Sequence, residues 1–368
     1  MNKEIISSKQ FQFLIFTFGL GSYLLFNLGA DAKQDAWISS ILATLLCLMT
    51  VSVYDKIMSY YPEKNIFEIL KLECGKIIGV ILSILYLIYI FLLGSYIFND
   101  FIDFIKITAL SRTPEPILII CIGLLSMWIL QSGIQVVSAW ADFLVKIILI
   151  FVILAWFLLI PQMHFFNIQP IFFQNSPYIL KECINMWAFP MNEVIIFLGF
   201  FDCIKCDTNI KTVFIKPIIF SGIIAVIFIL TNISILGGST YATSYYSGYE
   251  VAKRLKIGEE FQRIEIIVSA TFTIIQFLEI SYCLLSVTKG FKTLFNLTSY
   301  RNILVPLGFL MMNFTYIIFR SSLKALQFAT GLWIPYCLFM QVVLPIIILC
   351  MMWCKRKFNG NSHDADIN

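Results

Sequence analysis

Three ionisable side chains fall inside long apolar stretches of the sequence, where a charge is costly to bury. Glu193 and Glu279 lie within two of these stretches, and Lys146 lies within a third. Because a charged residue at the membrane centre costs roughly 3 kcal/mol on insertion scales, each of the three is a functional candidate. The two carboxyl groups could exchange protons or pair with a neighbouring group in a structural role. Lys146 could take an ion-like position between helices one, five and eight, or its ammonium could extend to the membrane surface.

Two of the apolar stretches also contain residues that can interrupt a helix near its middle. Gly19-Leu20-Gly21 lies in the first stretch and Pro190 with Asn192 in the sixth, at corresponding places in two sets of five. This arrangement is typical of inverted-repeat transporters, in which unwound backbone at the midplane holds a ligand. Alternatively, the glycines let helices approach closely and the proline makes a tolerated kink.

Backbone freed at two such breaks would suit an amino acid in its zwitterionic form. Free N–H groups at a half-helix start attract a carboxylate, and unpaired carbonyl groups attract an ammonium. We therefore expect the ligand carboxylate at the first break and its ammonium at the sixth stretch, with aromatic side chains as the walls of the pocket. The candidate ligand-binding residues are Phe18, Gly19, Leu20, Gly21, Ser22, Tyr96, Ala188, Phe189, Pro190 and Tyr282.

The elements that position these residues are predicted to be membrane-spanning helices. Of 368 residues, 59% are hydrophobic and 13% are charged, which leaves too little polar surface for a soluble domain. A spanning helix needs about 20 apolar residues, and ten stretches qualify. They are residues 10–29, 36–54, 77–98, 117–134, 137–160, 184–201, 217–237, 264–287, 303–319 and 329–353. The sequence thus predicts an all-α membrane protein of ten transmembrane helices.

The predicted organisation is a single permease-like domain over residues 1–354, with one repeat near 10–160 and a second near 184–354. Most of the 26 Lys and Arg residues fall on the side of the predicted loops that includes the N-terminus. Because cytoplasmic loops carry the excess of basic residues, both termini are predicted inside, with a polar cytoplasmic tail over 355–368. Asp100 and Asp103 are expected in a charged outer loop.

The residue types give no support to catalysis, metal binding or nucleic-acid binding. Neither histidine lies in an apolar stretch, and no Ser or Cys nucleophile stands beside a plausible base. Cys203 and Cys206 form a single C-x-x-C motif, whereas structural zinc needs four ligands. With a net charge of +4, the chain has no basic block dense enough to follow a phosphate backbone. We therefore predict no enzyme activity, cofactor, metal or nucleic-acid partner.

Two parts of the sequence carry motifs of a known family. The first part is Ile6-Ser7-Ser8-Lys9-Gln10, followed after the first apolar stretch by Gly29-Ala30-Asp31-Ala32-Lys33-Gln34-Asp35-Ala36-Trp37-Ile38. The second comprises Leu236-Gly237, Tyr246, Tyr249-Glu250-Val251-Ala252-Lys253-Arg254 and Gln262-Arg263-Ile264-Glu265. Both parts resemble the spore germination permease family, the B subunits of bacterial spore germinant receptors. Many family members have proline after the tyrosine that corresponds to Tyr246, whereas this chain has Ser247.

The resemblance implies a LeuT-like fold of the amino acid, polyamine and organocation transporter superfamily, a 5+5 inverted repeat with helices 1 and 6 broken. It also implies a place in the spore inner membrane and two partners, an A subunit and a lipoprotein C subunit. We accordingly expect a receptor subunit that binds a small nutrient germinant, such as an amino acid, in the mid-membrane core and signals to its partners. A proton-coupled amino acid transporter and a conduit for water or small ions are the alternative hypotheses.

Overall fold

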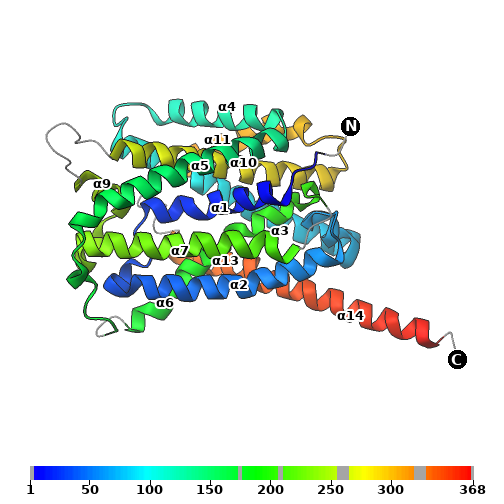
Figure 1. Ribbon diagram of the computed structural model, residues 1–368. Coiled ribbons are helices and arrows are strands. Elements are labelled where there is room, and N and C mark those ends of the chain that lie inside the picture. The colour runs from blue at the N-terminus through cyan, green and yellow to red at the C-terminus, as the bar shows by residue number, and fades with distance from the viewer. Residues whose placement is uncertain (1–3, 173–175, 206–209, 255–264, 319–328, 366–368) are drawn as a thin grey trace.

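Long apolar runs form helices in a bilayer because every backbone polar group there must be paired within its own segment. The computed structural model describes residues 4–172, 176–205, 210–254, 265–318 and 329–365. In this part of the chain, eight helical segments are long and apolar enough to cross a membrane, and a shorter apolar helix spans Glu115–Gln131. The protein is therefore an all-helical membrane protein, with its helices side by side in one bundle (Figure 1).

The helices follow one another along the chain with short connections. In the first half they are α1 Ser8–Leu25, η1 Ala30–Asp35, α2 Ala36–Tyr60, α3 Ile66–Thr108, α4 Glu115–Gln131, α5 Ile134–Leu159, η2 Ile160–Gln162 and η3 Phe165–Ile168. In the second half they are α6 Ser176–Ala188, η4 Met191–Cys203, α7 Ile210–Leu236, α8 Gly238–Thr243, α9 Ser247–Arg254, α10 Glu265–Phe295, α11 Arg301–Ile318, η5 Ala329–Trp333, α13 Ile334–Leu338, η6 Phe339–Val343 and α14 Leu344–Ala365. Each of the ten predicted stretches overlaps a helical segment.

The first helix is unbroken, so the interruption predicted at Gly19-Leu20-Gly21 is wrong. A capping box starts α1, in which the Gln10 amide donates to Ser7 Oγ at 3.2 Å and the Ser7 amide donates to Gln10 Oε1 at 2.9 Å. The helix then runs to Leu25. Its glycines allow close packing instead, because a Cβ added at Gly19 would lie 3.0 Å from Ser221 Oγ on α7.

The sixth stretch changes its helix type at its proline. The α-helix α6 ends at Ala188, and the chain continues after Phe189 and Pro190 as the 3-10 helix η4. Proline has no N–H to donate and does not continue a regular α-helix. Every residue of η4 except Asp202 is buried, so this segment runs through the interior of the bundle.

The third helix is longer than the predicted stretch and includes residues expected in an outer loop. It begins at a capping box in which the Glu68 amide donates to Asn65 Oδ1 at 3.0 Å, turns at Gly75 with φ of +78°, and ends at Thr108. Asp100 and Asp103 therefore lie within α3. The helix continues past them because apolar side chains at helical spacing, including Phe101 and Phe104, remain buried.

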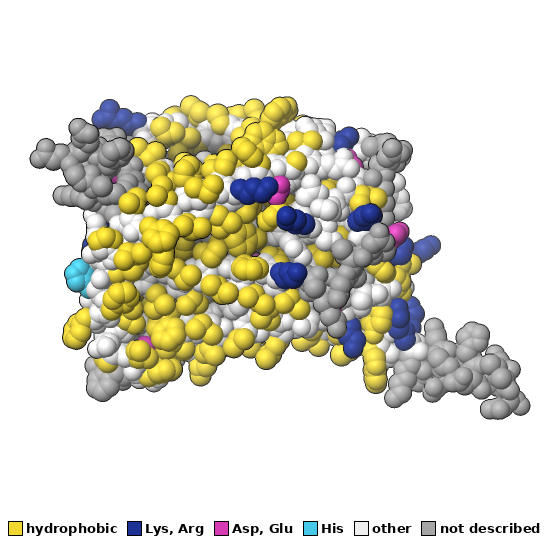
Figure 2. Space-filling model, viewed as in Figure 1, with side chains coloured by type: hydrophobic (Ala, Val, Ile, Leu, Met, Phe, Trp, Pro, Cys, Tyr) yellow, Lys and Arg dark blue, Asp and Glu magenta, His cyan; other side chains and the backbone are white. Residues whose placement is uncertain are grey.

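The central position in the bundle belongs to α1, which contacts α5, α7, α10 and η4. The start of the chain and the end of α14 lie at the same end of the bundle, and α9 lies at the opposite end (Figure 1). Figure 2 shows that hydrophobic side chains cover most of one face and that most of the visible Lys and Arg side chains gather toward the end with the termini. We call the end with the termini the basic end, and the other the α9 end.

Candidate functional site

The closest approach between α1 and α10 joins a glycine to a buried carboxyl group. A Cβ added at Gly21 would overlap Glu279 Oε1 and would lie 2.9 Å from Ile275 Cγ2. Glu279 is 2% exposed, and its Oε1 accepts no hydrogen bond from the residues that the structure describes. The carboxyl group of Glu279 is thus pressed against the backbone of α1 at a place where no side chain intervenes.

A second buried carboxyl group follows the junction between α6 and η4. Glu193 is 2% exposed, and its Oε1 likewise has no hydrogen-bond partner among the described residues. The neighbouring Asn192 is fully buried, and its Nδ2 has no acceptor in the same part of the chain. Glu193 and Glu279 interact electrostatically with each other and with the thiol of Cys283, one turn beyond Glu279 on α10. Both carboxyl groups lie in the part of the core where η4 packs against α10.

The third carboxyl group of this region was expected in an outer loop. Asp100 on α3 is 6% exposed and interacts electrostatically with both Glu193 and Glu279. One feature of the sequence could have indicated it, because Asp100 follows the aromatic and apolar run that ends in Phe98 by only two residues. The predicted span ended too early to include it.

The carbonyl groups at the end of α6 are largely occupied. Gln341 of η6 donates from Nε2 to the Ala188 carbonyl at 3.0 Å and to Tyr89 Oη at 2.7 Å. The Pro190 carbonyl accepts from the Glu193 amide at 3.4 Å, and the Phe189 amide donates to the Asn185 carbonyl at 2.8 Å. A ligand ammonium at the Ala188 carbonyl would therefore compete with a buried glutamine.

The aromatic residues chosen as pocket walls divide into two groups. Phe18 and Tyr282 both pack against Phe197 of η4, with ring centroids 5.7 Å apart in each pair, and Tyr282 Oη lies 3.1 Å from Thr17 Oγ1. Tyr96 instead stacks on Trp333, with centroids 6.2 Å apart. These residues are packed core rather than the lining of an open pocket. Phe189 is partly buried against the same core, and Leu20 and Ser22 are buried within α1.

Lys146 lies outside this region. Its side chain is 61% exposed on α5 and forms an ion pair with Asp142 at 2.9 Å, one turn earlier on the same helix. The position between helices one, five and eight is therefore wrong. The exposed ammonium agrees with the other hypothesis, in which a long apolar stem carries the charge toward the membrane surface.

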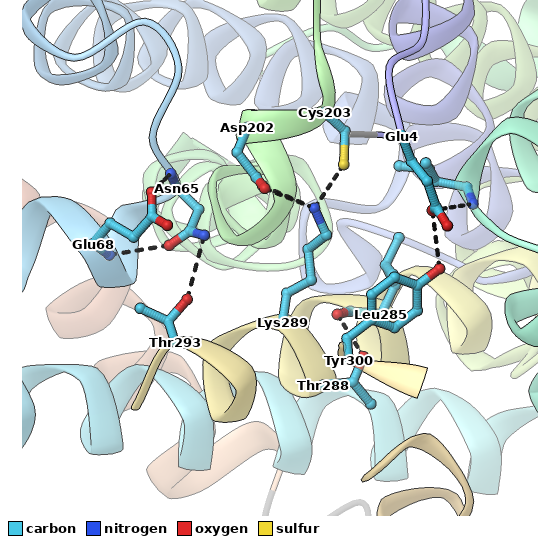
Figure 3. Close-up of polar contacts among 11 residues, drawn as sticks. Glu4, Asn65, Glu68, Asp202, Cys203, Leu285, Thr288, Lys289, Thr293 and Tyr300 are labelled. Carbon is cyan, nitrogen blue, oxygen red and sulfur yellow. Dashed lines mark hydrogen bonds and ion pairs between the residues drawn. The ribbon is translucent and has the colours of Figure 1, made fainter. Parts of the chain in front are cut away.

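The core is closed at the basic end by a polar network that sequence reasoning missed (Figure 3). Lys289 on α10 donates to Asp202 at 2.9 and 3.0 Å and contacts Cys203 Sγ at 2.6 Å. Arg301 pairs with Glu4 at 2.5 Å. Tyr300 Oη also donates to Glu4, at 3.1 Å. The sequence feature that could have predicted this network is the pair of opposite charges, Asp202 and Lys289, just after the sixth and eighth stretches.

The N-terminal segment is attached to the same closure through its backbone. The Ile6 amide donates to the Cys203 carbonyl at 2.8 Å, and the Lys205 amide donates to the Ile6 carbonyl at 3.2 Å. The start of the chain and the end of η4 are thereby paired as a short parallel bridge. Cys206, the other cysteine of the C-x-x-C motif, lies outside the described residues.

The α9 end is closed by aromatic side chains. Tyr246 packs against Phe26 and Phe104, with centroids 5.7 and 5.3 Å apart, and Phe104 packs against Phe272 at 4.7 Å. Burial raises the pKa of the Tyr245 phenol, and the carboxyl group of Asp100 raises it further, so this tyrosine pair lies near the acidic core. Gly248 lets α9 rest on α1, because a Cβ there would overlap the Leu24 carbonyl. Arg263, part of the motif that resembles the family, lies outside the described residues.

With both ends closed, a small cavity remains where α1 meets α2, α7 and η4. Its volume is about 10 Å³, and its lining includes Gly19 and Tyr23 of α1, Thr44 of α2 and Met191 of η4. A cavity needs about 10–15 Å³ to hold one water molecule. This cavity is therefore too small for a nutrient-sized ligand, which would need helix movement to fit there.

The family model for spore germination proteins matches residues 5–323 of this sequence. The chain belongs to the spore germination protein family. Within the family, spore germination protein KB of Bacillus subtilis (strain 168) is 24% identical over 311 residues, which are 84% of this chain and 83% of that protein. Spore germination protein XB of Bacillus anthracis is 20% identical over 333 residues, 88% and 90% of the two chains.

This spore germination family member shares its fold with solved transporters of the LeuT type. The transporter MhsT in complex with L-phenylalanine has a TM-score of 0.66 and 12% identity, covering 96% of this chain and 99% of that one. A substrate-bound Na⁺-coupled sialic acid symporter has a TM-score of 0.64 and 12% identity, covering 92% and 79%. At this identity the likeness establishes the fold alone.

Proposed function

We propose that this spore germination family member is the B subunit of a germinant receptor. It binds a small nutrient germinant in the mid-membrane core and passes a conformational signal to an A subunit and a lipoprotein C subunit. Its place is the spore inner membrane, with both termini and the tail over 355–368 on the cytoplasmic side. The domain over 1–354 is a LeuT-like pair of five-helix repeats, near 10–160 and 184–354, in which the junction before η4 serves as the broken element.

The observation that carries this proposal is the contact between Gly21 and Glu279. A carboxyl group without a partner, deep in an apolar core, is expensive unless a ligand or proton compensates it. The contact lies where α1 and α10 meet beside η4, which brings a fixed polar group to the crossing of three helices. Phe18 and Tyr282 supply the apolar wall next to it. A site with few polar groups and an apolar lining is the usual character of small-molecule pockets.

Closure at both ends supports a signalling role for the same site. A ligand can shift a conformational equilibrium only if it binds one state better than the other. The polar network around Lys289 and the aromatic cluster around Tyr246 lie at opposite ends of the bundle and share α10, which carries both Lys289 and Phe272, so a shift of α10 would act on both closures. Nutrient binding between the two closures would then favour one arrangement, which partner subunits detect.

The test is a substitution that fills the contact without touching the rest of the core. Gly21→Leu should abolish nutrient-triggered germination, measured as the fall in optical density of spores carrying the variant, while immunoblotting finds normal amounts of protein in the membrane. Gly331→Leu is the matched control, because a Cβ there meets no atom within 4 Å. A normal response of the Gly21→Leu spores would remove the pocket from α1.

A second candidate function is proton-coupled amino acid transport. The observation in its favour is the pair of buried carboxyl groups, Glu193 and Glu279, which could carry protons between the two ends of the core. Counterflow of labelled amino acid into proteoliposomes that contain this chain alone separates the two functions. Saturable exchange without partner subunits would favour transport, and its absence would favour the receptor.

A further inference from the structure

The core of the bundle carries an excess of buried acid. Asp100, Glu193 and Glu279 come from three different helical segments, and each lies within electrostatic range of another. Within the described ranges, no salt bridge joins any of them to a lysine or arginine. The buried Lys289 is held by Asp202 at the basic end. Any compensating positive charge for these carboxyl groups must therefore come from outside the described chain.

The polar atoms left without partners in this region are mainly acceptors. Besides Oε1 of Glu193 and of Glu279, Gln276 Oε1 is buried without a hydrogen bond, three residues before Glu279 on α10. The phenol Oη of Tyr23 on α1 is also buried and unpartnered, can donate as well as accept, and interacts electrostatically with Glu193. An ammonium group carries three donors and no acceptor, so it suits a set of unfilled oxygens.

The donors that a ligand carboxylate would need are scarce in the same place. The amides of Gly19 and Gly21 lie inside a continuous α-helix, where each N–H pairs with the carbonyl four residues earlier. Among the described residues of α1, η4 and α10, Asn192 Nδ2 is the one buried side-chain nitrogen without an acceptor, and the Tyr23 hydroxyl is a further neutral donor. One neutral amide donor can meet a carbonyl oxygen, but it cannot balance a buried negative charge.

We propose that the core selects ligands with a net positive charge, namely compounds that carry a primary ammonium group and a neutral carbonyl in place of a carboxylate. The ammonium sits between Glu193 and Glu279, and Asn192 donates to the carbonyl. This inference rests on the proposed function, because it names the class of nutrient that the same site accepts. It differs from the zwitterion predicted from the sequence, since that site required free backbone amides in α1.

The test compares amino acids with their carboxamides, which differ only in the charge at the carboxyl group. The full chain in lipid nanodiscs contains seven tryptophans, so its thermal unfolding can be followed by intrinsic fluorescence. The probes are L-alanine, L-leucine and L-phenylalanine, each beside its amide, at pH 7. We expect at least one amide to raise the unfolding temperature at a concentration about tenfold or more below that of its parent amino acid.

Three variants assign the effect to residues. Glu193→Gln and Glu279→Gln should each weaken amide binding about tenfold or more, whereas Glu250→Gln, at a half-exposed glutamate on α9 that pairs with Lys253, should leave it unchanged. If a variant does not fold, the amide-to-acid preference of the unaltered chain still decides the matter. Equal or tighter binding of an amino acid than of its amide would overturn this inference and leave nutrient binding intact. Stabilisation by none of the six compounds would count against both.

Discussion

Lys289 donates to both carboxylate oxygens of Asp202, at 2.9 and 3.0 Å, and thereby joins the end of α10 to the end of η4. The two side chains are only 7% and 18% exposed. Removing one partner of a mostly buried pair strands the other charge, at a cost of about 3–5 kcal/mol, whereas replacing both with apolar residues is often neutral. The pair therefore gives a double-mutant cycle with a clear expectation.

We expect Lys289→Met and Asp202→Leu to lower the thermal unfolding temperature individually, and the double variant to recover most of the loss. The measurement is fluorescence-monitored unfolding of the purified chain. A double variant as unstable as the sum of the singles would mean that the pair does not hold the two helix ends together.

The contact between η4 and α10 depends on a second glycine. A Cβ added at Gly199 would overlap Ser286 Oγ, which donates to the Ile196 carbonyl at 3.0 Å. We predict that Gly199→Ala destabilises the chain by about 1–3 kcal/mol through overpacking. Ser286→Ala in the same chain should restore part of this loss by removing the overlapping oxygen. Additive losses in unfolding experiments would contradict the predicted contact.

Gln341 links η6 to the end of α6. Gln341→Leu keeps a similar volume but leaves the Ala188 carbonyl and Tyr89 Oη without this donor, which should cost about 1–3 kcal/mol of stability. Gln341→Glu is the informative companion, because it keeps the length of the side chain while losing the donor. If both variants unfold at the temperature of the unaltered chain, these hydrogen bonds contribute nothing measurable.

The lid at the α9 end rests on α1 through Gly248. We predict that Gly248→Ala lifts α9, because the added Cβ would overlap the Leu24 carbonyl, which is backbone and cannot rotate away. Amide hydrogen exchange in residues 247–254 should then become faster, while exchange in α3 stays unchanged. Gly331→Ala is the control, since a Cβ there meets open space. Unchanged exchange at α9 would show that the lid is held elsewhere.

The helices could be predicted from the sequence because each needs only a sufficiently long apolar run. Pro190 also indicated where the sixth stretch changes, since proline excludes a regular helix locally. The glycines of α1 were misleading for a physical reason. Glycine at position 21 is compatible with an unwound segment and with a helix packed closely on α10, and the choice depends on Glu279, which is 258 residues away in the chain.

The positions of ionisable residues were harder to predict than the helices that carry them. Lys146 lies on α5, where apolar side chains occupy both the buried and the exposed sides of the helix, so periodicity does not tell the lipid-facing side from the core. Asp100 was left out of the predicted span because the span was ended at Phe98, before the charged residues. The helix α3 continues for eight residues beyond Asp100. In both cases the burial of the side chain depends on which helices pack beside it. The residues nearby in the sequence do not carry this information.

The bridge between Ile6 and Ile204 has a practical result for experiments on the whole receptor. Because Ile6 is tied by main-chain hydrogen bonds to the end of η4, displacement of that buried segment must pull on this part of the chain or break the tie. A fluorescent probe fixed near Glu4 would thus report events at the centre of the bilayer from an accessible position. A bulky tag fused at that terminus would instead disturb η4, the segment whose movement is to be measured.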